Sequence, residues 1–455
     1  MTTAESILAP AYRRLTIAIV ATVAFIAFET MAVATVMPVA VRDLGGLPLY
    51  AWAFSAMITT SLFAMVVSGE LCDRRGPRLP LLTGAAIFAA GLVAAGSATS
   101  MWPFIAGRAA QGLGAGLVIV ALYVVIARAY AHELRPRIFA ATAAAWVLPS
   151  IVGPVVAGTL ADYVSWRLVF LGMAPLVIVP VVVAMPQVTA YDGAVATVRR
   201  PYRIWFAAAT ALGMGLLQAA GLERDAAALG LAVIGVALLA RSLPRLMPAG
   251  TFALRRGLPT VVAMRGILAG AFFGAEAFVP LMLVDQRGLS ATLAGLVLTC
   301  GALGWAGGSW YQGRPALAMP RHVLLRLGCA LVAAGIAATG LVLIPGVPVW
   351  VAAATWAVGA VGMGLAFATV SVLLFQLSPP AEHGSNSAAL QLSDASFSIV
   401  FVGLAGVIFA SSHQSGDGAG PGGYAVIGVV MVALALVGSW AAGRVRARTE
   451  SQPAV

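Results

Sequence analysis

The sequence contains no lysine, so all 27 of its basic residues are arginines. A Walker-type phosphate-binding loop needs a lysine, and so does an enzyme that works through a Schiff base. The chain is therefore expected neither to hydrolyse ATP by itself nor to catalyse a lysine-dependent reaction. Any work that it does must draw on an ion gradient or on a partner, and we expect no cofactor.

Charged residues of both signs are scarce, at 9% of the 455 residues, whereas 61% are hydrophobic. A water-soluble fold of this composition would lack the polar surface to cover itself, so the chain is expected to lie in a lipid bilayer. The excess of basic residues is then explained by membrane topology, and we expect no nucleic-acid partner.

Cysteine and histidine are also few. The three cysteines, Cys72, Cys300 and Cys329, are far apart and have no metal-ligand spacing. The four histidines fall in or beside expected loops, which argues against a histidine proton relay. We expect no metal site and no enzymatic activity, because the sequence has no catalytic cluster of His, Cys or paired carboxylates.

What the sequence has in abundance is apolar runs of the roughly 20 residues that cross a hydrocarbon core of about 30 Å. We expect fourteen such helices, and hence an all-α, polytopic membrane protein. Their expected limits are 15–38, 50–71, 79–99, 102–127, 138–161, 166–186, 202–221, 226–243, 259–284, 290–311, 322–345, 349–376, 385–410 and 424–443.

The arginines orient these helices, because short cytoplasmic loops carry the excess of positive charge. With both termini inside, 21 arginines lie in inner segments, four lie outside, and Arg108 and Arg265 lie within helices. Arg265, like Arg128, is expected to snorkel toward the inner surface. Charge alone does not separate fourteen helices from twelve, since removing 202–221 and 226–243 together preserves the pattern. The first apolar run is too long for the core of a signal peptide, so we expect it to stay in the protein.

The loop expected between the second and third helices is short and charged, and reads GELCDRRGPR over Gly69–Arg78. A glycine at its start allows close helix approach, and Asp73 can accept hydrogen bonds from an arginine or a helix N-terminus. The loop can therefore act as a conformational latch, although an ordinary basic inner loop is the simpler interpretation. The residues assigned to the latch are Gly69, Asp73, Arg74, Gly76 and Arg78. A related segment, Gly308–Arg314, has Gln312 in place of the aspartate, which indicates two related halves and argues against a second latch.

A second pattern, R-x-x-Q-G-x-G, lies early in the helix expected at 102–127 and comprises Arg108, Gln111, Gly112 and Gly114. An arginine about six residues into a span is costly in lipid, so it should face the bundle interior and pair with a carboxylate. Snorkelling to the outer surface is the alternative.

A third pattern lies in the helix expected at 138–161 and comprises Pro149, Gly153, Pro154 and Gly158. Proline removes a backbone hydrogen bond and small neighbours allow close packing, so we expect a kinked helix.

In this order the three patterns resemble signatures of the major facilitator superfamily, and the third resembles the element found in its antiporters. The two additional helices resemble its fourteen-helix drug:proton antiporter branch. That resemblance implies six-helix bundles at 1–187 and 258–443, two additional helices within 188–257 and a cytoplasmic tail at 444–455. It also implies a monomer in the cytoplasmic membrane that exports small amphipathic or lipophilic compounds in exchange for protons as its bundles rock.

Three carboxyl groups within expected spans are candidates for proton coupling, together with Arg108. Glu29 lies nine residues before a proline, as in a pattern that opens many drug:proton antiporters, and Glu276 lies nine residues before an aspartate. Each is thus expected roughly 14 Å from the outer end of its helix, and both could face a common cavity. Asp394 is the third candidate. A structural hydrogen bond between helices is the alternative role for each.

Other functions of the same fold stay open. An uptake symporter, or an exporter of lipids or metabolites, would share these patterns, although the antiporter element argues against uptake. A membrane enzyme or assembly factor would need a polar cluster at the membrane face. The expected partners are the lipid bilayer, a small amphipathic substrate and protons.

Overall fold

The computed structural model describes residues 6–131, 134–190, 202–220, 226–313, 319–378, 383–413 and 420–446. Within these ranges the chain folds into helices joined by turns and contains no strand. Several sequence predictions fall outside them, namely the outer turn 222–225, the inner residues Arg199, Arg200 and Arg314, and the tail from residue 447 onward.

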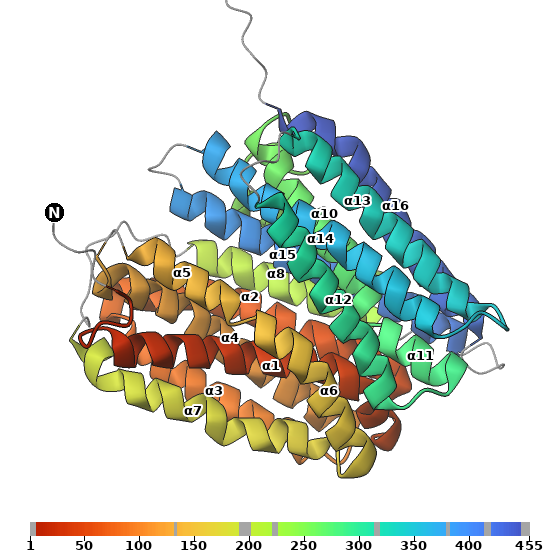
Figure 1. Cartoon of the computed structure of the whole chain (residues 1–455), viewed down its shortest axis with the longest axis horizontal. Coiled ribbons are helices and arrows are strands. Elements are labelled where there is room, and N and C mark those ends of the chain that lie inside the picture. The colour runs from red at the N-terminus through yellow and green to blue at the C-terminus, as the bar shows by residue number, and fades with distance from the viewer. Residues whose placement is uncertain are drawn as a thin grey trace, which may run out of the picture.

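The helices form two bundles that lie side by side (Figure 1). The first bundle contains α1 (Arg13–Asp43), η1 (Leu47–Leu49), α2 (Tyr50–Arg75), α3 (Arg78–Gly96), α4 (Met101–Ala129), α5 (Arg135–Ala144), α6 (Val147–Tyr163) and α7 (Arg167–Thr189). The second contains α10 (Leu258–Glu276), α11 (Val279–Arg287), α12 (Ala291–Gln312), α13 (Arg321–Thr339), η2 (Gly340–Leu343), α14 (Trp350–Leu377), α15 (His383–His413), α16 (Pro421–Ala441) and η4 (Ala442–Val445). Between them in sequence come α8 (Tyr202–Ala220) and α9 (Ala226–Leu246), which pack on each other.

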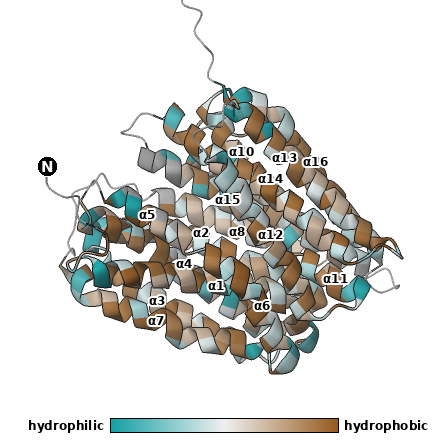
Figure 2. Cartoon of the chain, viewed as in Figure 1, coloured by the Kyte–Doolittle hydropathy of each residue, from teal (hydrophilic) through white to brown (hydrophobic). Residues whose placement is uncertain are grey.

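Twelve helical spans in the described ranges are long and apolar enough to cross a membrane, with α10 and α11 together forming one of them. Figure 2 shows apolar residues along most of each helix, with hydrophilic residues gathered near the ends. α6 and the described part of α8 are apolar but shorter. Every predicted helix therefore has a counterpart, but length and composition do not confirm fourteen spans.

The prediction of one continuous helix over 138–161 is wrong. The chain leaves the helix after Ala144 and enters α6 at Val147, so Pro149 lies in the first turn of a new helix. A missing N–H costs little there, because the first turn has no helical acceptor for it. Pro154 is the proline that lies inside α6.

The single helix predicted at 259–284 is also wrong. α10 ends at Glu276 and α11 begins at Val279, with Pro280 in the first turn of α11. Proline has no N–H to donate to the carbonyl four residues earlier, so a continuous helix would leave the Glu276 carbonyl unpaired. Glu276 therefore ends a helix instead of lying in the middle of one.

The beginning of α1 and the ends of α2 and α4 meet at one end of the first bundle. The hydroxyls of Thr16 and Tyr130 are 2.8 Å apart, and Arg128 donates to the Cys72 carbonyl at 3.2 Å. In the second bundle the beginning of α10 meets the end of α16, since the Gly257 N–H donates to the Arg444 carbonyl. We call this the arginine-rich end, after the arginines that flank these helices, and the other the opposite end.

The two bundles meet closely at the opposite end. α6 packs on α12 so tightly that a Cβ on Gly158 would lie 2.6 Å from the Thr292 Cα. Arg42 at the end of α1 forms an ion pair with Asp285 of α11 at 2.8 Å. Figure 1 shows the ribbons of the bundles close together near α6 and α11, and diverging toward α5 and the beginning of α15.

Candidate functional site

Glu29 and Arg108 form a buried ion pair inside the first bundle. The two side chains are 0% and 3% exposed, and Arg108 Nη1 donates to Glu29 Oε1. The same nitrogen donates to Gln111 Oε1, while Arg108 Nε donates to the Ala53 carbonyl at 3.0 Å. The prediction that Arg108 faces inward and finds a carboxylate is confirmed, and the arginine does not snorkel.

The glycines of α4 bring its neighbours close enough to build this network. Gln111 Nε2 donates to the Gly91 carbonyl of α3 at 3.2 Å. A Cβ on Gly114 would lie 2.5 Å from the Gly84 carbonyl of α3, and one on Gly112 would collide with α2. The ion pair is therefore held by four helices, α1 to α4.

The two oxygens of the Glu29 carboxylate differ in their hydrogen bonding. Within the described residues, buried Glu29 Oε2 has no hydrogen-bond partner, whereas Oε1 accepts from Arg108. A carboxylate oxygen in an apolar interior without a donor is poorly compensated. It is also the position where a proton can be added without breaking an existing hydrogen bond.

A second ion pair lies in the other bundle. Arg265 of α10 donates through Nε to Asp394 Oδ2 of α15 at 2.9 Å, and the side chains are 11% and 19% exposed. The prediction that Arg265 snorkels is wrong, because a carboxylate within reach compensates its charge inside the bundle. Asp394 was a predicted candidate, but its partner was not foreseen.

Glu276 stands apart from both pairs. Among the described residues it makes no hydrogen bond or ion pair, and Glu29 is committed to Arg108. The predicted match in depth is also wrong, since α1 continues through Pro38 to Asp43 and places Glu29 about 21 Å from its end. The two glutamates therefore do not form the symmetric pair that the sequence indicated.

The charged segment Gly69–Arg78 does not form the predicted loop, because Gly69–Arg75 are the last turns of α2. Arg74 bonds Glu70 within its own helix at 2.6 Å, and Asp73 has no hydrogen-bond or ion-pair partner among the described residues. Gly76 takes a φ of +85° where the chain turns, but Gly69 has open space where a Cβ would lie. The close approach expected at Gly69 is thus wrong.

The corresponding position in the second bundle behaves differently. Gln312, which occupies the position that corresponds to Asp73, accepts a hydrogen bond from Arg321. That bond ties the end of α12 to the beginning of α13, within one bundle.

The proline and glycine residues of α6 lie at the contact between the bundles. A Cβ on Gly295 of α12 would lie 2.7 Å from the Pro154 carbonyl, and Gly158 makes the second close approach. At the end of α6, Asp162 accepts from the N–H groups of Ala291 and Thr292 at 3.0 and 2.8 Å. Asp162 therefore caps α12 of the other bundle, a role that sequence reasoning missed.

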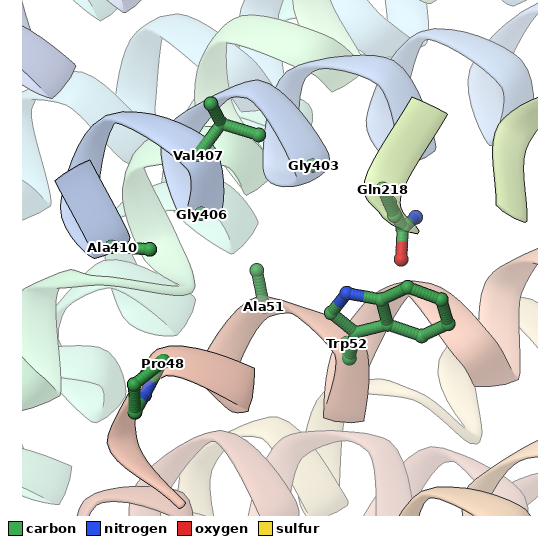
Figure 3. Close-up of a pocket in the computed structure, with 8 residues that line it drawn as sticks. All are labelled: Pro48, Ala51, Trp52, Gln218, Gly403, Gly406, Val407 and Ala410. Carbon is green, nitrogen blue, oxygen red and sulfur yellow. The ribbon is translucent and has the colours of Figure 1, made fainter. Parts of the chain in front are cut away.

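α8 lies at the contact between α2 and α15. Ser55 of α2 donates to Gln218 Oε1 at 2.6 Å, and both residues are buried. Figure 3 shows Gln218 facing Trp52 beside a pocket of about 10 Å³. The pocket is lined by Pro48, Ala51, Trp52, Gln218, Gly403, Gly406, Val407 and Ala410. It has room for about one water molecule, which is too small for a substrate.

The described residues contain no group of three or more His, Cys, Asp or Glu side chains placed to hold a metal ion. Among the described residues, the candidate proton-coupling carboxyl groups are therefore Glu29 and Asp394, each paired with an arginine, and Glu276, which lies apart from them. Such groups suit proton or ion binding within a membrane protein.

Comparison with known proteins identifies relatives of this chain. A probable multidrug-efflux transporter of Mycobacterium tuberculosis (strain ATCC 25618 / H37Rv) is 25% identical over 436 residues, 90% of each chain. The multidrug transporter protein MdtP of Bacillus subtilis (strain 168) is 32% identical over 158 residues. That match spans 35% of this chain and only 29% of MdtP.

Solved structures agree in fold. The POT family transporter PepTSo matches 94% of this chain and 98% of its own, with a TM-score of 0.69 and 14% sequence identity. A peptide transporter POT in complex with alafosfalin matches 95% of both chains with a TM-score of 0.67. The sequence profile of the Major Facilitator Superfamily matches residues 18–402. The chain is therefore a multi-pass integral membrane protein that belongs to the major facilitator superfamily of transporters.

Proposed function

We propose that this protein exports small amphipathic compounds across the cytoplasmic membrane in exchange for protons, by alternating access and as a monomer. The observation that carries the proposal is the buried Glu29–Arg108 pair, whose bare Oε2 can take a proton. The multidrug names of its relatives support export over uptake. The antiporter-like element of α6, at the contact between the bundles, supports the same direction.

A proton on Glu29 would remove the charge that Arg108 binds. Arg108 would keep its bonds to the Ala53 carbonyl and Gln111, while the restraint on α1 weakened. Because α1 also packs on α11 and α12, its displacement would reach the contact between the bundles. Protonation and the relative position of the bundles are thereby coupled.

We assign the arginine-rich end to the cytoplasm, so both termini lie inside. With that assignment the contacts between the bundles close the outside, and we propose that this conformation opens to the inside. Opening outward must break the Arg42–Asp285 ion pair and pull Asp162 from the beginning of α12. The free Asp73 fits this state, since the inner latch would form only when the inside closes.

We also propose that α6 and α8 span the bilayer, which gives fourteen spans. α8 and α9 form a tight hairpin, with the Thr210 and Ser242 hydroxyls 2.8 Å apart. Single cysteines at Ser165, between α6 and α7, and at Glu223, in a protein without its own three cysteines, test the count. Fourteen spans predict that an impermeant thiol reagent labels both positions only from outside. Labelling of either position from inside would contradict fourteen spans.

Everted membrane vesicles with an acidic interior test the transport proposal. An amphipathic substrate of an antiporter should dissipate the pH gradient when it is added to vesicles that contain the protein. Vesicles without the protein serve as the control. An absence of proton flux across a panel of amphipathic compounds would contradict proton-coupled export. Proton movement that runs with the substrate would instead identify an uptake symporter.

A further inference from the structure

We propose that Asp394, Phe367, Gln391 and Ser371 form a binding site for planar organic cations, and that Arg265 occupies this site as a tethered substitute for the ligand. The inference deepens the proposed function, on which it rests, by naming a substrate class and a second site.

The guanidinium of Arg265 is held as a bound planar cation would be held. In addition to Asp394, it donates to Ser371 Oγ and to Gln391 Oε1, each at 3.3 Å. Its Cζ lies 3.2 Å from the centroid of the Phe367 ring. Hydrogen-bond acceptors surround the edge of the guanidinium, and an aromatic ring covers one of its faces. Any planar, delocalised cation could bind in the same way, because only the aliphatic part of the side chain is particular to arginine.

A ligand cation can replace Arg265 at Asp394 because the arginine can move toward the arginine-rich end. It lies seven residues after the beginning of α10, about 10 Å from the arginine-rich end, where a long side chain can reach water. The side chains of Arg265 and Asp394 are already 11% and 19% exposed, whereas Glu29 and Arg108 are almost fully enclosed. The second ion pair is thus more accessible to a ligand than the first.

The site faces the other bundle and continues into an aromatic surface. Tyr123 of α4 lies within electrostatic range of Arg265 from across the divide between the bundles. On the second bundle, the rings of Phe367 and Trp305 are 5.1 Å apart, and those of Trp305 and Phe273 are 6.1 Å apart. All three rings are partly exposed. They offer an apolar surface for the hydrophobic part of an amphipathic cation whose charge binds Asp394.

Binding of benzamidinium to the purified full-length protein in detergent tests the site without any gradient. Arg265→Ala removes the tethered competitor and should lower the Kd for benzamidinium by about tenfold or more relative to wild type. Adding Asp394→Asn should abolish that gain. Arg128→Ala, which removes an arginine bonded to the Cys72 carbonyl, should bind as wild type does.

Arg265→Gln provides a second neutral variant if the alanine variant does not fold, and circular dichroism checks both. The proposal is overturned if neither neutral variant binds more tightly than wild type, or if Asp394→Asn leaves the gain intact. The predicted gain in benzamidinium binding together with no proton flux from wild-type vesicles would leave this site standing and remove the proposed antiport, so the two failures are distinguishable.

Discussion

Tyr50, at the beginning of α2, donates its hydroxyl to the carbonyl oxygen of Ala277 at 2.6 Å. Ala277 lies in the break between α10 and α11, directly after Glu276. The same tyrosine ring contacts Phe278 and Phe409 of the second bundle, with centroids 5.1 and 6.4 Å away. A residue of the first bundle therefore supplies a donor to the broken helix of the second, at the end where the bundles are closed.

Tyr50→Phe removes this donor and keeps the ring. We expect the variant to favour opening of the opposite end by about 1–2 kcal/mol, because the closed state would then hold an unpaired buried carbonyl. Spin labels at Trp102 and Ile344, which are exposed at that end of the two bundles, report the opening as a longer distance. An unchanged distance distribution would show that the hydrogen bond does not hold this end closed.

Asp162→Asn should weaken the same closed end by about 1 kcal/mol, since a carboxylate at a helix N-terminus interacts with both the N–H groups and the dipole. The same pair of spin labels measures the change. Glu70→Gln is the matched control, because Glu70 bonds Arg74 within one helix and touches no contact between bundles. Equal shifts in both variants would rule out a specific role for the Asp162 cap.

Gly158→Ala should destabilise the closed contact by about 1–3 kcal/mol, because the new methyl would lie 2.6 Å from the Thr292 Cα and force the helices apart. Gly153→Ala, five residues earlier on the same helix, would place its methyl 3.5 Å from the Met31 Cβ, an ordinary contact. Thermal unfolding in detergent compares the two. If Gly153→Ala is as unstable as Gly158→Ala, the loss of stability does not come from the close approach to Thr292.

Arg108→Ala should destabilise the protein by about 3 kcal/mol or more, because it leaves the Glu29 carboxylate buried without a partner. Combining it with Glu29→Gln should restore part of that loss, since no charge then remains buried. Unfolding of both variants and of Glu29→Gln completes a double-mutant cycle. Additive losses would show that the two side chains do not interact.

The positions of the helices were predictable because each span must satisfy its own backbone in lipid and therefore shows a long apolar run. Both breaks were missed for a common reason. In a sequence, a proline such as Pro280 is compatible both with a kink inside a helix and with the first turn of a new helix. Packing against neighbouring helices decides between the two. The break between α5 and α6 also affects the number of spans, because α6 alone is shorter than the helices that are long enough to cross a membrane.

Within the site, the Glu29–Arg108 pair was predictable and the Arg265–Asp394 pair was not. The cost of an arginine in lipid indicated that Arg108 would find a carboxylate, and the pattern in the first helix pointed to Glu29. Asp394 is 129 residues from Arg265 in the sequence, so no local spacing joins them. Asp162 looked like an ordinary residue at the end of a span, because its role depends on the other bundle.

Proton flux through Glu29→Gln protein in everted vesicles tests the central claim most directly. The variant keeps the shape of Glu29 and an acceptor for Arg108, but it cannot exchange a proton. We predict substrate-driven proton flux with the wild type and none with Glu29→Gln, at equal amounts of inserted, folded protein. Wild-type flux from Glu29→Gln would contradict the account and move proton coupling to another group.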